Sequence, residues 1–184
     1  MKAAVRDICR KLVKLDNYTI CLYRRLRELE LWAYRLSDKL IYKGVKEVEP
    51  KPPRCPVEVY TAVYILSREG VPALWVKALF SPDEGLIALQ PVVNVDAAVK
   101  AFLHEVAHYT QFRMLECNTL LFHELVQTHA SQMEKRAEEM GSELWRMLKP
   151  GERRELAAIV EKALKEVQPL HRSWLQKQLA MHGG

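Results

Sequence analysis

The sequence lacks any apolar run near the length of about 20 residues that a membrane-spanning helix requires. It also lacks the features of a secretory signal, because the opening stretch MKAAVRDICRKLVK interrupts its apolar residues with charges too often. From these two absences we expect a cytoplasmic protein with no membrane-embedded segment.

Cysteine is scarce, and the four copies, Cys9, Cys21, Cys55 and Cys117, never stand in CxxC spacing. Neither a zinc knuckle nor a thioredoxin-type redox site is therefore indicated. We expect free buried thiols. The even count also permits two disulfides, which would be unusual in the cytosol except in hyperthermophiles.

A large excess of charge is missing too, since 28 Lys and Arg face 23 Asp and Glu in 184 residues. The basic residues concentrate between positions 6 and 27, interleaved with apolar residues at helical spacing. We interpret them as the solvated face of amphipathic helices. An acidic partner or a nucleic-acid surface is the alternative, but no RNA- or DNA-binding motif accompanies the charge, so we do not expect a nucleic-acid partner.

The chain has no internal repeat and no low-complexity segment, and its 184 residues with 49% hydrophobic content can bury one core. We expect a single α+β domain over residues 1–184. Its parts would be N-terminal helices in 1–48, a core in 57–140 and a long C-terminal helix in 150–182, of which 151–180 carries an apolar stripe.

Apolar spacing predicts two N-terminal helices, at 3–15 and 18–43, or one helix with a break between them, with Gly44 as a stop. The segment EPKPPRCP at 49–56 has four prolines and cannot continue a helix, so it forms a linker.

The sheet is predicted from three segments rich in β-branched, aromatic or aliphatic residues. Residues 57–66 and 73–80 are joined by the turn-like SREGVP and predict a hairpin. Residues 86–93 are limited by Pro91, which suits a third strand near a sheet edge. We therefore expect a small, mostly antiparallel, three-stranded sheet.

The sequence HEVAH at 104–108 lies in a helix that we expect over 95–113, with Asn94 or Asp96 as its N-cap. Because each helical residue advances about 100°, the two histidines lie about 40° apart on one face, one turn from each other.

This spacing is typical of a metal site. His104 and His108 can reach one tetrahedral zinc ion, and Glu105 lies beside the metal, where it can take a proton from a zinc-bound water and pass it to a leaving amine. The alternative, two surface histidines on an amphipathic helix, is weakened by the apolar neighbours Phe102, Leu103, Val106, Ala107 and Phe112.

A catalytic zinc usually takes three protein ligands and keeps one position for water. The spacing HExxHxxGxxH is absent, because Gln111 and Met114 stand where its glycine and last histidine would be. The metzincin arrangement is therefore excluded.

A glutamate on the next helix, expected over 119–140 and ending at Gly141, is the other common solution. Glu124 is our candidate, with Thr128 on the same face to hydrogen-bond its carboxylate, and Glu116 is a weaker rival in the turn. We interpret the charge run Glu134, Lys135, Arg136, Glu138 and Glu139 as a solvated face.

HEVAH at 104–108, followed by ELVQTHAS at 124–131, resembles the gluzincin branch of zinc metallopeptidases. Small members of that branch, the minigluzincins and the ImmA/IrrE-like peptidases, show a related order of helix, small sheet, HExxH helix and glutamate helix. The match covers about 30 residues, and where relatives often carry ExxAD this chain has Gln127 and Thr128.

The resemblance implies a zincin-like fold in which His104, His108 and Glu124 bind zinc and Glu105 is the general base. It also implies that the strand 86–93 forms the upper rim of the cleft, where an extended peptide could pair with an open edge.

The leading hypothesis is a zinc-dependent peptidase acting on a peptide or protein. A zinc-binding regulatory or interaction protein with the same fold and little turnover is the alternative, although a purely structural site gains nothing from Glu105. A metal-free helical domain with an accidental motif is the third. Candidates for stabilising an oxyanion are Tyr60, Tyr64, Tyr109, His123, His129 and His171.

Overall fold

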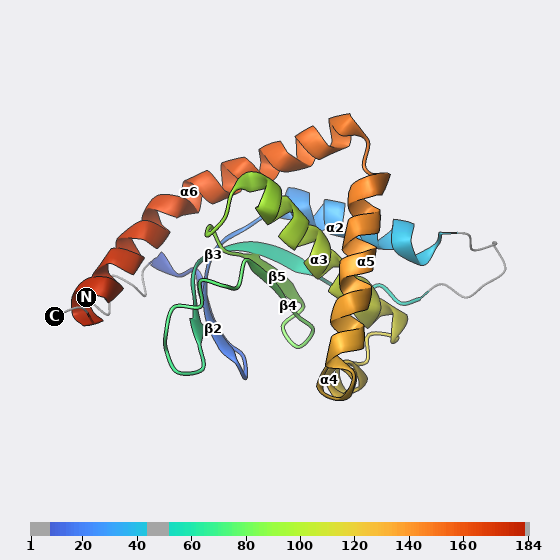
Figure 1. Cartoon of the computed structure of the whole chain (residues 1–184), viewed down its shortest axis with the longest axis horizontal. Coiled ribbons are helices and arrows are strands. Elements are labelled where there is room, and N and C mark those ends of the chain that lie inside the picture. Colours follow the sequence, from blue (N-terminus) through green and yellow to red (C-terminus); the bar gives the residue numbers. More distant parts are fainter. Residues whose placement is uncertain (1–7, 44–51, 183–184) are drawn as a thin grey trace.

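The computed structural model describes residues 8–43 and 52–182 and has an α+β fold (Figure 1). One mixed sheet contains β1 (Lys11–Lys14), β2 (Tyr18–Arg25), β3 (Glu58–Ser67), β4 (Ala78–Ser81) and β5 (Leu86–Leu89). The helices are α2 (Arg27–Ile41), α3 (Val95–Met114), α4 (Thr119–Thr128), α5 (Ala130–Met147) and α6 (Pro150–His182). None of these helices combines the length and apolarity that crossing a membrane requires.

The strands lie in the order β1-β2-β3-β5-β4, so β1 and β4 are the edges of the described sheet. β3 and β5 pair in parallel, whereas the other neighbours pair antiparallel. The α+β prediction is confirmed, but the expected count of three strands is wrong because β1 and β2 come from a segment that we expected to be helical.

The predicted helices 3–15 and 18–43 are wrong over residues 11–25, which form β1 and β2. Side chains of β2 are buried on both of its faces: Ile20 packs in one apolar cluster, while Cys21 packs in another with Trp174 of α6. A strand covered on both faces shows a continuous apolar run instead of alternation, and such a run cannot be told from a helix by spacing alone.

Only the later part of the second predicted helix is helical, as α2. Its expected stop, Gly44, and residues 3–7 of the first predicted helix lie outside the described residues, as does part of the proline-rich linker 49–56.

The predicted hairpin between 57–66 and 73–80 is also wrong. β3 pairs with β2 and β5, and the chain after it forms only one isolated bridge before β4 begins at Ala78. The predicted strand 86–93 contains β5, but β5 lies between β3 and β4 rather than at the edge. The open edge therefore belongs to β4, which pairs antiparallel with β5.

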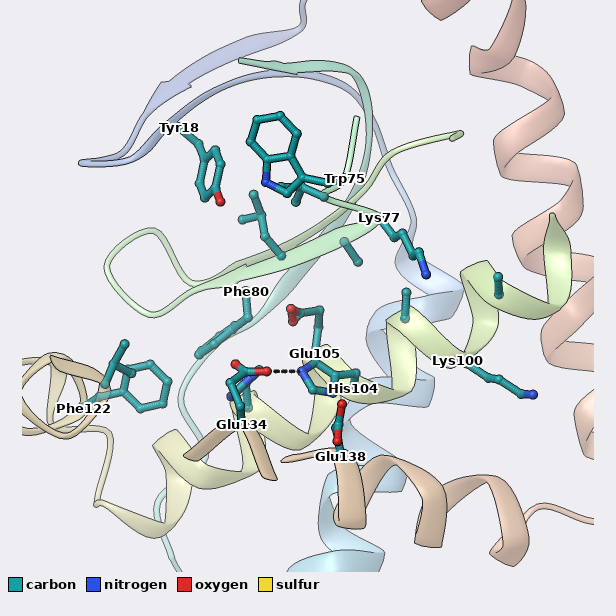
Figure 2. Close-up of a pocket in the computed structure, with 17 residues that line it drawn as sticks. Tyr18, Trp75, Lys77, Phe80, Lys100, His104, Glu105, Phe122, Glu134 and Glu138 are labelled. Carbon is teal, nitrogen blue, oxygen red and sulfur yellow. Dashed lines mark hydrogen bonds and ion pairs between the residues drawn. The ribbon is translucent and has the colours of Figure 1, made fainter. Parts of the chain in front are cut away.

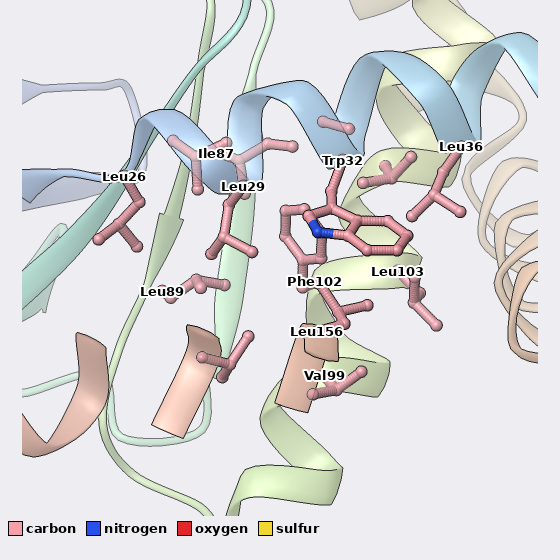
Figure 3. Packing of buried hydrophobic residues seen from close by; sticks show 14 of the residues in the cluster. Leu26, Leu29, Trp32, Leu36, Ile87, Leu89, Val99, Phe102, Leu103 and Leu156 are labelled. Carbon is pink, nitrogen blue, oxygen red and sulfur yellow. The ribbon is translucent and has the colours of Figure 1, made fainter. Parts of the chain in front are cut away.

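The largest apolar cluster lies where α2, α3 and α6 cover one face of the sheet (Figure 3). Trp32 of α2, Phe102 of α3 and Leu156 of α6 meet there with Ile87 and Leu89 of β5, and all five are buried. This packing fixes α3 against the sheet, and α3 carries the HEVAH sequence.

The helix predicted over 95–113 is confirmed as α3. Its N-cap is Asn94, whose Oδ1 accepts a hydrogen bond from the N–H of Ala97 at 2.8 Å. The C-terminal helix is confirmed as α6.

The glutamate helix predicted over 119–140 is instead two helices, α4 and α5, which meet at His129. Gly141 does not end α5, because the buried stripe Ala137, Met140 and Leu144 carries the helix on to Met147. The glycine serves a different purpose, since a Cβ built on it would lie 3.4 Å from the Cα of His104. It lets α5 pack directly against the backbone of α3.

All four cysteines are paired, so the expectation of free thiols is wrong. Cys9 bonds to Cys21 and Cys55 to Cys117, with Cα atoms 5.1 and 6.2 Å apart. The second bond anchors the turn between α3 and α4, where Glu116 and Cys117 have φ of 57° and 56°. The sequence spacing could not decide between thiols and disulfides, because pairing depends on which strands and turns come together.

Candidate metal centre

His104, Glu105 and His108 of α3 line a cleft of about 990 Å³ between α3 and the edge strand β4 (Figure 2). The segment around β4 forms one wall of the cleft, and α3 forms the opposite wall. Helix α5 adds Glu134 and Glu138, and α4 adds Phe122 and Val126.

His104, His108 and Glu134 converge at the floor of this cleft. One oxygen of Glu134 lies 3.1 Å from Nε2 of His104, and the other lies 2.8 Å from Nε2 of His108. The two imidazoles stand nearly perpendicular, with ring centroids 4.8 Å apart. All three ligand atoms lie within 4.8 Å of one another, which is the spacing of groups that can share one cation.

The structure places Glu134, rather than the predicted Glu124, beside the two histidines. Glu124 is exposed on α4 and does not line the cleft. The reason is the orientation of α4: Phe122 is buried against Phe80 and Phe112, and a residue two positions further along a helix points about 160° away. The hydroxyl of Thr128, expected beside the Glu124 carboxylate, donates instead to the main-chain carbonyl of Glu124 at 2.8 Å.

The charged residues Glu134, Lys135, Arg136, Glu138 and Glu139 are exposed, as the solvated-face interpretation expected. That interpretation missed that Glu134 and Glu138 also line the cleft. The sequence did contain a signal for this. Ala137 begins the buried stripe of α5, and Glu134 precedes it by three residues, so both lie on the face that packs against α3.

Gln111 orients His108. From the sequence we used this residue only to exclude the metzincin spacing and did not predict a role for it. Its Nε2 donates to the carbonyl oxygen of Met133 at 3.0 Å, which turns its Oε1 toward Nδ1 of His108 at 2.8 Å. Because Oε1 can only accept, Nδ1 must carry a proton, and Nε2 is the nitrogen left to face Glu134. A single buried amide thus connects one histidine to the residue next to Glu134.

Glu105 points into the cleft from α3 (Figure 2), and its side chain is almost fully buried. Its Oε2 has no hydrogen-bond partner among the described residues. Burial raises the pKa of Glu105 to about 8. A buried carboxyl without a partner is costly, and a cation nearby would favour its charged form.

The pKa values of the two histidines are shifted in opposite directions. Burial lowers the pKa of His104, aided by the neighbouring His108. Burial also acts to lower the pKa of His108, but the hydrogen bond to Glu134 and the charges of Glu105 and Glu134 outweigh it, so the net shift is upward. The hydrogen bond from His108 lowers the pKa of Glu134 to about 2. Glu134 is therefore held as a carboxylate.

The donor set fits a zinc ion. Two imidazole nitrogens and one carboxylate oxygen are the usual ligands of a catalytic zinc, and the orphaned oxygen of Glu105 stands next to them. The cleft leaves space beside the cluster for a further ligand.

None of the six side chains expected as oxyanion donors lines this cleft. Several have other partners: the hydroxyl of Tyr109 donates to the carbonyl of Cys55 at 2.6 Å, and that of Tyr60 donates to Glu58 at 2.8 Å. Outside the HEVAH sequence, the side-chain donors that do line the cleft are Tyr18, Trp75, Lys77 and Lys100. We did not predict Tyr18 as a cleft residue, because we expected its strand, β2, to be part of a helix.

Comparisons with models of known protein families, with characterised proteins and with solved structures found no match. The candidate site therefore rests on its own geometry.

Proposed function

We propose that this chain is a zinc-dependent metallopeptidase with a zincin-like fold, in which His104, His108 and Glu134 hold the metal. The observation that carries the proposal is the convergence of their three ligand atoms within 4.8 Å at the floor of the cleft. The buried carboxyl of Glu105 beside them supports it, because a structural metal site has no use for a base next to an open position.

When bound, zinc would polarise the carbonyl of the scissile peptide bond and lower the pKa of a water molecule. Glu105 would take a proton from that water, whose oxygen bonds to the carbonyl carbon. It would then deliver the proton to the amine nitrogen as the carbon–nitrogen bond breaks. Gln111 would keep Nε2 of His108 directed at the metal throughout.

The open edge of β4 offers a place for an extended substrate. The carbonyl of Lys77 accepts a hydrogen bond from the N–H of Gln90 at 3.0 Å, so the main chain of Lys77 faces β5. Antiparallel pairs alternate between bonded and non-bonded positions, so the N–H and C=O groups of Ala78 and Phe80 face outward from the sheet. A peptide could pair with these groups as an added strand.

The proposal is tested with the zinc-loaded protein and a library of peptides, by identifying new termini with mass spectrometry. We expect cleavage by the wild-type protein, none after chelation, and recovery when zinc is restored. Glu105→Gln should retain zinc and lose cleavage by at least about 100-fold, the size typical of a lost general base. Unchanged cleavage in this variant would refute the proposed mechanism.

A further inference from the structure

The two ends of the cleft differ in chemistry, and the metal cluster lies between them (Figure 2). Phe80 and Phe122 form an apolar end. Lys77 and Lys100 carry their ammonium groups at the other end. In Figure 2 the two phenylalanines lie on one side of Glu134 and His104, the two lysines lie on the other, and Tyr18 and Trp75 lie above them.

Lys77 is the basic residue available to a ligand. It is exposed, it lies directly before β4, and it makes no ion pair with any described residue. Figure 2 shows its side chain extending from the β4 wall toward α3. Lys100 is engaged elsewhere, because its Nζ lies 5.4 Å from the centre of the Trp145 ring.

None of the three carboxyl groups that line the cleft, Glu105, Glu134 and Glu138, forms an ion pair with Lys77. Glu134 is bonded to both histidines, and Glu138 lies on α5 beside His104, on the side of the cleft opposite β4 (Figure 2). An unpaired ammonium at one end of a cleft attracts a negatively charged ligand group and sets its orientation.

The direction of β4 decides which part of a peptide would meet Lys77. β4 runs from Ala78, next to Lys77, toward Phe80 at the apolar end. Antiparallel pairing is the more frequent and slightly more stable arrangement. An antiparallel peptide on this edge would therefore place its earlier residues near Phe80 and its later residues near Lys77.

We propose that the cleft selects peptides with an apolar side chain before the scissile bond and a carboxylate after it, and that Lys77 binds this carboxylate. The inference rests on the proposed peptidase function. The carboxylate is either that of an Asp or Glu side chain or the free end of a peptide that stops shortly after the cut.

Binding to zinc-loaded Glu105→Gln tests the inference without requiring cleavage. The probes are short peptides with a fluorophore at the amino end, measured by fluorescence anisotropy. A peptide with the order Phe-Glu in an alanine background is compared with its Glu-Phe isomer and with Phe-Gln, all amidated at the carboxyl end. A Phe-Ala peptide, amidated or with a free carboxylate, distinguishes the two sources of the charge.

We expect Phe-Glu to bind about tenfold more tightly than Glu-Phe or Phe-Gln, and we expect adding Lys77→Glu to remove this preference. Lys162→Glu, on the distant helix α6, makes the same charge change and should leave it intact. Equal binding of all peptides, the reverse order preference, no binding, or a preference that survives Lys77→Glu would each overturn the inference. Failure of the peptidase function would appear separately, as absence of cleavage by the wild-type protein.

Discussion

Nδ1 of His108 donates a hydrogen bond to Oε1 of Gln111 at 2.8 Å, and the same amide donates to the carbonyl of Met133 at 3.0 Å. Gln111 therefore fixes the ring of one proposed ligand and ties it to the helix that supplies another. The two helices of the site are joined at this point and also, about two turns earlier along α3, at the close approach of Gly141 to His104.

We predict that Gln111→Ala lowers the affinity for zinc about 10- to 100-fold, the range observed when the partner of a ligating histidine is removed. Competition with a chromophoric chelator measures this. Gln127→Ala, which truncates an exposed glutamine of α4, is the matched control and should bind zinc like the wild-type protein. Equal affinities in the two variants would show that Gln111 does not position His108.

The parts of the site that lie within one helix could be predicted from the sequence, because helix geometry relates residues four positions apart. His104, Glu105 and His108 share α3, and the structure brings the two histidines together as expected. Glu134 could not be predicted in the same way, because its position depends on which later helix packs against α3. The first helix, α4, turns Phe122 inward, and only α5 packs with a carboxylate toward the histidines.

The sheet was harder to predict than the helices for a related reason. β3 and α3 have local patterns that identify them, whereas β2 is recognisable only once both of its faces are known to be covered. The identity of the edge strand depends on the parallel pairing of β3 with β5, which joins distant segments.

The disulfides give a second prediction. In the unreduced, unfolded protein, alkylation should label none of the four cysteines, and mass spectrometry should find the pairs Cys9–Cys21 and Cys55–Cys117. Labelling of all four thiols would contradict the two disulfides. Because the cytosol keeps thiols reduced, it would also favour the expected cytoplasmic location.

The same bonds should differ in their effect on stability. Loop closure predicts that removing Cys55–Cys117, with a sequence separation of 62, costs about 4 kcal/mol of unfolding free energy, against about 3 kcal/mol for Cys9–Cys21, with a separation of 12. Urea titration of the two double Cys→Ser variants gives the order. A larger loss of stability on removing Cys9–Cys21 would show that strain in the folded state or residual structure in the unfolded state outweighs loop-closure entropy.

A fourth prediction concerns the buried ion pair that joins α3 to α2. Nη1 of Arg113 donates to Asp38 at 2.8 Å and to the hydroxyl of Ser37 at 2.9 Å, and Arg113 is only 1% exposed. Asp38→Ala should lower the unfolding free energy by about 3 kcal/mol, because it leaves a buried guanidinium without its counter-charge.

The matched control is Glu161→Ala, which breaks the exposed pair with Lys165 and should change stability by less than about 0.5 kcal/mol. Thermal or urea unfolding of both variants makes the comparison. Similar losses would mean that the Arg113 pair contributes no more than a surface pair.

The fifth prediction is the most direct test of the metal centre. We would measure the zinc content of the purified protein by elemental analysis and compare Glu134→Ala with Glu124→Ala. We expect near-stoichiometric zinc in the wild-type protein and in Glu124→Ala, and strongly reduced zinc in Glu134→Ala, because Glu134, unlike Glu124, contacts both His104 and His108. Retention of zinc by Glu134→Ala together with its loss from Glu124→Ala, or no bound metal in the wild-type protein after zinc is supplied, would contradict it.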